Sequence, residues 1–129
     1  MQEQLSIYRK SLALRDMSEA IAHYFEYRKD ALVLSRYPGL RDDVVHCLVA
    51  DASLITKEVE TAAHSSSYSK RMKSLTFINV MTRNILSYCN GLEKDGVKEK
   101  EYLNLLRTEL KSFRRAFKKW RRSLQNGLD

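Results

Sequence analysis

The sequence predicts an all-α protein, an up-down-up-down four-helix bundle formed by a single domain over residues 1–129. Two observations predict this fold class. The 129 residues include only 4 Gly and 1 Pro, which is few for a β-rich fold with many tight turns. Apolar residues also recur every three or four positions over long stretches, and this is the period of one helix face. Short turns between such stretches place successive helices antiparallel.

The first two helices are predicted at about residues 6–35 and 40–63. The apolar face of the first comprises Leu14, Met17, Ile21, Phe25 and Leu32. Arg36-Tyr37-Pro38-Gly39 is predicted to break the chain. In the second helix, Asp42 and Asp43 in the first turn suit the positive end of the helix dipole. Its apolar face comprises Val44, Cys47 or Leu48, Leu54 or Ile55, Val59 and Ala62, and Asp51 interrupts this face as a partnered core polar group.

The third helix is predicted at about residues 68–90, after a break at His64-Ser65-Ser66-Ser67 that is rich in helix-capping residues. Its apolar stripe is broad, which predicts a central place in the core. The stripe comprises Met72, Leu75, Ile78, Met81 or Thr82, Ile85, Leu86 and Cys89. Asn90-Gly91 is predicted to end this helix, and Asp95-Gly96 signals a further turn.

The fourth helix, at about residues 97–125, has the most regular pattern. Its apolar residues alternate in spacing between three and four, which is an a/d heptad seam and predicts near-antiparallel packing. These seam residues are Leu103, Leu106, Leu110, Phe113, Phe117, Trp120 and Leu124.

Positive charge is concentrated in the second half of the chain. The net charge is +7; residues 1–60 hold 8 basic and 10 acidic side chains, and residues 61–129 hold 15 and 6. Around the heptad seam lies a wide cationic face, with seven cations and no anion between Lys111 and Arg122. We predict a nucleic-acid-binding site comprising Arg107, Lys111, Arg114, Arg115, Lys118, Lys119, Arg121 and Arg122. Without a base-reading motif, this face predicts recognition of backbone or shape. A solvated surface, a calmodulin-target helix and a membrane-surface helix are alternatives.

Signals for catalysis, cofactors and metals are weak. His23, His46 and His64 form no spaced metal-ligand set, and there is no Gly-rich phosphate loop. We therefore expect no enzyme activity, no cofactor and no metal. One pattern supports an alternative: Arg41 and His46, with four residues between them, resemble the Arg-x4-His motif of the HEPN family of helical ribonucleases. That resemblance implies a metal-independent ribonuclease of toxin type; the other interpretation is a first-turn Arg and a surface His.

The layout as a whole resembles the Avd family, the accessory variability determinants of diversity-generating retroelements, and the four-helix proteins encoded in ribosomal-RNA intervening sequences. The resemblance covers residues 17–124. It rests on Ser35-Arg36-Tyr37-Pro38-Gly39-Leu40, His46-Cys47-Leu48-Val49, Met81-Thr82-Arg83-Asn84-Ile85-Leu86 and the late Trp120. Phe117-Lys118-Lys119 precedes this Trp, where Avd-like proteins commonly have a Gly.

The Avd resemblance implies a non-catalytic homo-oligomer, a pentamer, that binds template RNA or DNA and a reverse transcriptase. It implies a bacterial or phage origin. The small-residue flank at Ala116 and Ser123 is then a hypothetical contact with a neighbouring subunit. A bundle that only binds other proteins is a further alternative. We also expect a cytoplasmic protein, because both cysteines, Cys47 and Cys89, look like small core residues. Neither a membrane-length apolar run nor a secretory signal is evident.

Overall fold

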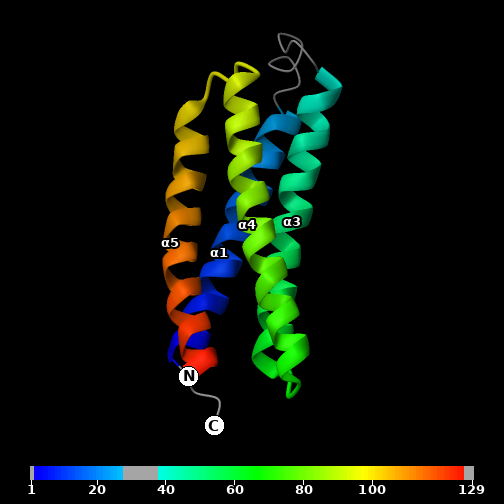
Figure 1. Cartoon of the computed structure of the whole chain (residues 1–129). Coiled ribbons are helices and arrows are strands. Elements are labelled where there is room, and N and C mark those ends of the chain that lie inside the picture. The colour runs from blue at the N-terminus through cyan, green and yellow to red at the C-terminus, as the bar shows by residue number, and fades with distance from the viewer. Residues whose placement is uncertain (1, 28–37, 127–129) are drawn as a thin grey trace.

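The computed structural model describes residues 2–27 and 38–126, and these residues form four α-helices and no strand. The helices are α1 (Gln2–Tyr27), α3 (Pro38–His64), α4 (Tyr68–Lys94) and α5 (Lys100–Asn126). They lie lengthwise beside one another (Figure 1). The predicted all-helical fold is confirmed over this part of the chain, and the arrangement fits a four-helix bundle.

Each helix packs against two others. Both α1 and α4 contact α3 and α5, whereas the diagonal pairs do not pack together within the described residues. The turn between α3 and α4 lies at the same end of the bundle as the start of α1 and the end of α5. The connection between α4 and α5 lies at the opposite end (Figure 1). The N-terminal part of α1 and the C-terminal part of α5 are therefore neighbours.

The first two helices differ from the prediction at their starts. Helix α1 begins at Gln2, not at about residue 6, and residues 28–37, with Leu32 and part of the predicted break, lie outside the described residues. The predicted break is wrong at Pro38 and Gly39, because α3 begins at Pro38. Proline suits the first helical position, where its missing N–H has no intrahelical partner in any case. Asp42 and Asp43 consequently lie beyond the first turn.

Helix α4 continues one turn past its predicted end. Asn90-Gly91 does not stop it, because Leu92, 1% exposed, holds the last turn against the core. The helix ends instead at Lys94, and Asp95 and Gly96 follow it; the φ of 89° at Gly96 suits a residue without Cβ. The Gly96 N–H donates to the Glu93 carbonyl at 3.1 Å, and the Val97 N–H to the Leu92 carbonyl at 3.2 Å. This is a Schellman motif, and α5 follows at Lys100, not at about residue 97.

The turn between α3 and α4 agrees better with the sequence. Ser67 caps α4, and its side chain accepts a hydrogen bond from the Lys70 N–H at 3.3 Å. Helix α3 ends at His64, so the connection comprises only residues 65–67.

The core draws buried apolar side chains from all four helices. The seam of α5 is buried from Leu103 to Trp120, as predicted, and Leu124 is half-buried. In α3, Leu48 and Ile55 are buried while Cys47 and Leu54 are exposed. The prediction of Cys47 as a core residue is therefore wrong, and of the alternatives that the pattern left open, Leu48 and Ile55 lie in the core.

Two features of α4 refine the predicted core. The helix is not central, because it packs only against α3 and α5 and leaves Phe77 and Val80 57% and 46% exposed. Asp51 of α3 is half-buried and partnered: its carboxylate accepts hydrogen bonds from the Tyr88 hydroxyl at 2.8 Å and the Asn84 amide at 3.4 Å. Burial and this carboxylate raise the pKa of Tyr88.

None of the helices in the described part of the chain combines the length and apolarity that crossing a membrane requires.

Candidate nucleic-acid interface

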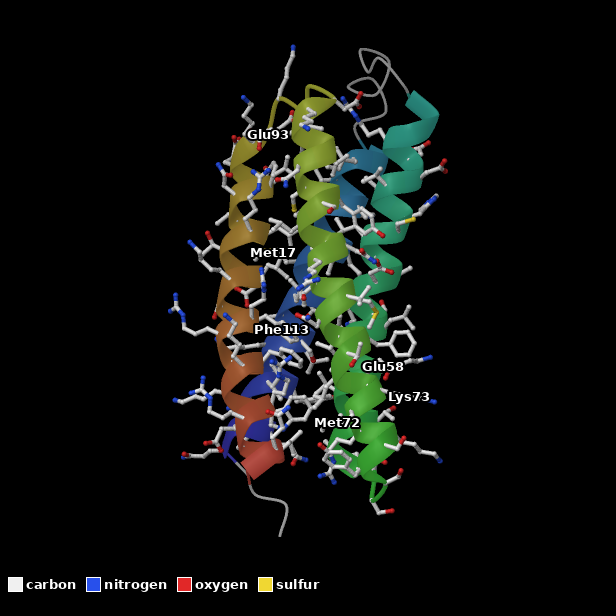
Figure 2. The ribbon with its side chains drawn as sticks, viewed as in Figure 1. Met17, Glu58, Met72, Lys73, Glu93 and Phe113 are labelled. Carbon is white, nitrogen blue, oxygen red and sulfur yellow. The ribbon has the colours of Figure 1, made fainter. Side chains whose placement is uncertain are left out.

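The burial of one side of α5 fixes the direction of its charges. Phe113 and Trp120 are 0% and 1% exposed, so the seam is locked against the bundle. Nitrogen-tipped side chains project from the outer side of α5 along its length (Figure 2). Six of the eight predicted binding residues are exposed: Lys111, Arg115, Lys118, Lys119, Arg121 and Arg122. Arg107 and Arg114 are half-buried.

We call the seven cations from Lys111 to Arg122 the α5 cationic face. None of them forms an ion pair with a carboxylate of the described residues. They also repel one another: eight of their pairs stand three or four residues apart, and each costs roughly 0.2–0.5 kcal/mol. The total is about 2–4 kcal/mol at low salt, which an anionic partner would relieve.

The spacing of this face suits a polyanion. Lys111 and Arg122 are eleven residues apart, or about 16 Å along a helix. Seven charges over that length amount to one per about 2.4 Å, while duplex DNA carries one negative charge per about 1.7 Å of its axis. The two charge densities are comparable, so one strand or one edge of a duplex could be neutralised along the helix.

Arg107 differs from the other predicted binding residues. Its guanidinium pairs with Glu93 at 2.6 Å and donates to the side-chain oxygens of Asn90 at 2.8 Å and Asn104 at 3.0 Å. Figure 2 places Glu93 at the end of the bundle where α4 is connected to α5. Arg107 therefore joins α4 to α5, and the charge that it offers to a ligand is already partly neutralised.

Two further arginines are positioned by apolar neighbours. The guanidinium carbon of Arg121 lies 5.9 Å from the centroid of the Phe117 ring, a cation–π distance. Arg114 and Lys111 flank a groove of about 290 Å³ between α4 and α5, where Leu86 contributes apolar surface. Both arginines belong to a fixed surface rather than to a flexible tail.

Helix α1 adds cations that sequence reasoning missed. Arg9 and Lys10 line a groove with Lys119 of α5, and the Lys10 ammonium donates to the Ser112 hydroxyl at 2.7 Å. Ala116, predicted as part of a subunit contact, lines this same groove inside the protomer. Two adjacent basic residues were visible in the sequence, but their approach to α5 depends on the packing of helices more than 100 residues apart.

The two residues of the ribonuclease hypothesis lie in different environments. Arg41 is 4% exposed; its Nε donates to an Asp95 carboxylate oxygen at 2.8 Å, and its Nη2 donates to the Asp95 carbonyl at 3.0 Å. This buried ion pair joins the start of α3 to the end of α4. His46 is exposed, more than one turn further along α3. The arrangement favours a structural role for Arg41, and the catalytic alternative stays a prediction.

No group of three or more His, Cys, Asp or Glu within residues 2–27 and 38–126 is placed to hold a metal ion. Comparison with known proteins finds no matching family model, curated protein or solved structure.

Proposed function

We propose that this protein binds nucleic acid through the α5 cationic face, without a catalytic step of its own. One observation carries the proposal: seven cations on a single rigid helix have no carboxylate partner among the described residues. Stability alone would not select this arrangement, because like charges at helical spacing destabilise the free protein. Phosphate groups would neutralise the face and release counterions.

In this proposal the protein recognises the backbone and the shape of the nucleic acid, not its base sequence. Lys and Arg on a helix surface suit phosphate contacts, which position a nucleic acid but carry no sequence information. The Avd resemblance extends the proposal to template RNA, favoured over DNA, and to a reverse transcriptase as protein partner. A cytoplasmic location and a bacterial or phage origin belong to the same proposal.

The proposed assembly is a homo-oligomer of up-down-up-down bundles, a pentamer by the same resemblance. The positions of the two connections at opposite ends of the bundle support the helix order (Figure 1). Exposed apolar side chains on α4, Phe77 and Val80, support a subunit contact, since large exposed apolar groups mark interaction surfaces when they cluster.

Light scattering tests this assembly and should give a mass well above 15.1 kDa. The substitutions Phe77→Ser and Val80→Ser together should lower that mass. A monomeric wild type would refute the assembly.

Charge reversal tests the binding surface. Replacing Arg114, Arg115, Lys118 and Lys119 with Glu should abolish binding of a labelled RNA in a gel-shift assay, with helicity unchanged by circular dichroism. The matched control replaces four exposed cations of α3 and α4 with Glu, which gives the same change in net charge. The control residues are Lys57, Lys70, Lys73 and Arg83. Binding lost equally in both variants, or retained in the first, would contradict the proposal.

The alternatives predict other outcomes. If the protein were a ribonuclease, labelled RNA would be degraded in EDTA by the wild type and not by His46→Ala; we expect both to leave it intact. If the chain were only a protein-interaction bundle, neither RNA nor DNA would bind at low salt.

A further inference from the structure

A groove between α1 and α5 is lined by residues from the first turns of α1 and from the C-terminal half of α5. Figure 1 shows the start of α1 and the end of α5 at the same end of the bundle. The groove has a volume of about 560 Å³. Three cations line it, Arg9 and Lys10 from α1 and Lys119 from α5, against one carboxylate, that of Glu3. Ala116 contributes only a methyl group on the α5 side, which leaves room between the charged side chains.

Lys10 lines this groove from α1. Its side chain is half-buried and its ammonium is held by the Ser112 hydroxyl at 2.7 Å. No carboxylate of the described residues lies within ion-pair distance of Lys10, Arg9 or Lys119. The structure therefore holds the Lys10 ammonium between the two helices, bound to a neutral hydroxyl, and its charge remains available to an anionic ligand.

The start of α1 adds to this preference. Gln2, Glu3 and Leu5, in the first turns of the helix, also line the groove. The first turn of a helix carries the positive end of the helix dipole. Lysine and arginine side chains together match the several acceptor oxygens of a phosphate.

We propose that the α1–α5 groove is a phosphate-binding site, occupied by a phosphate group of the nucleic-acid strand that lies on the α5 cationic face. Lys119 belongs both to the α5 cationic face and to the lining of the groove. A nucleic-acid strand bound along α5 would therefore pass directly over the groove. The identity of the strand rests on the proposed function, whereas affinity for phosphate does not. An internal phosphodiester and a terminal phosphomonoester share this chemistry, and the monoester carries the greater charge.

Inorganic pyrophosphate tests the groove without nucleic acid. Isothermal titration calorimetry should show binding to the wild-type chain and at least tenfold weaker binding to Arg9→Gln with Lys10→Gln. A charge-matched control outside both proposed binding surfaces, Lys73→Gln with Arg83→Gln on α4, should bind as the wild type does. Circular dichroism checks that each variant is folded. Absent binding to the wild type, or equal binding to the Arg9/Lys10 variant, would overturn the proposal.

Short RNAs then distinguish the two sources of phosphate. If a terminal phosphate occupies the groove, the wild type will prefer a 5′-phosphorylated RNA to a 5′-hydroxyl RNA, and Arg9→Gln with Lys10→Gln will remove the preference. If an internal phosphate occupies it, the variant will weaken both RNAs, and the log–log salt slope will fall by about 0.7 per lost contact. RNA binding with neither effect would refute phosphate binding in the groove, but it would not contradict the proposed function. Pyrophosphate binding without RNA binding would refute the proposed function alone.

Discussion

Replacing Arg115 and Lys118 with glutamine should stabilise the free protein while weakening its binding to nucleic acid. Both side chains are exposed and neither pairs with a described carboxylate. Together they take part in six of the eight like-charged pairs of the α5 cationic face. Glutamine has nearly the helix propensity of lysine and arginine, so the substitutions remove charge and little else.

The expected gain follows from these pairs. At roughly 0.2–0.5 kcal/mol each, six pairs amount to about 1–3 kcal/mol at low salt. An unfolding entropy of about 2.1 cal/mol/K per residue converts this range into a rise in Tm of about 4–11 °C. Salt screens exposed charges, so the gain should shrink as ionic strength rises.

Thermal and urea unfolding monitored by circular dichroism measure the gain at 20 mM and 500 mM salt. Arg83→Gln is the matched control, because Arg83 is an exposed helical cation with no charged residue three or four positions away. Its substitution should leave Tm unchanged. The claim is that repulsion between the like charges of the α5 cationic face destabilises the free protein. It would be refuted by a double variant that is no more stable than the wild type at low salt, or that is stabilised equally at high salt.

Three further predictions concern the bundle. Asp95→Asn should destabilise the fold by about 3 kcal/mol in urea unfolding, because it removes the carboxylate charge from the buried Arg41–Asp95 ion pair; a loss below about 1 kcal/mol would contradict this role. Phe113→Ala should cost about 3–5 kcal/mol, since the ring is fully buried; a surface-like effect would show that the α5 seam is not packed. At pH 8 a thiol reagent should modify exposed Cys47 rapidly and Cys89 only on unfolding. Burial raises the pKa of Cys89 to about 11, so about one molecule in a thousand carries its thiolate at that pH; two fast-reacting thiols per chain would be the contrary result.

The sequence predicted best where a local pattern was long and regular. The seam of α5 repeats at heptad spacing over three heptads, and tertiary packing did not alter it. The end of α4 was mispredicted because Asn90-Gly91 has a strong local preference for a stop, and the burial of Leu92 outweighs it. The start of α3 was mispredicted because proline both ends one helix and begins another, and sequence spacing alone does not separate these uses.

The candidate site was predictable only where its residues share one helix. The charges of α5 follow directly from the heptad register. The neutralisation of Arg107 by Glu93, by contrast, depends on how α4 and α5 are placed side by side. The same holds for Lys10, whose partner Ser112 is 102 residues away in the sequence, and for Arg41 with Asp95, 54 residues apart. Contacts of this range arise from the packing of the bundle and leave no local signal.

The salt dependence of RNA binding measures how many phosphate groups the α5 cationic face neutralises. Fluorescence anisotropy with a labelled single-stranded RNA gives Kd over a series of salt concentrations. If the α5 cationic face neutralises several phosphates, log K should fall linearly with log salt at a slope of about −3 to −5, or about −0.7 per phosphate contact. The Arg115→Gln, Lys118→Gln variant should show a shallower slope by about 1 to 1.5. A slope near zero in the wild type, or the same slope in both proteins, would contradict the account.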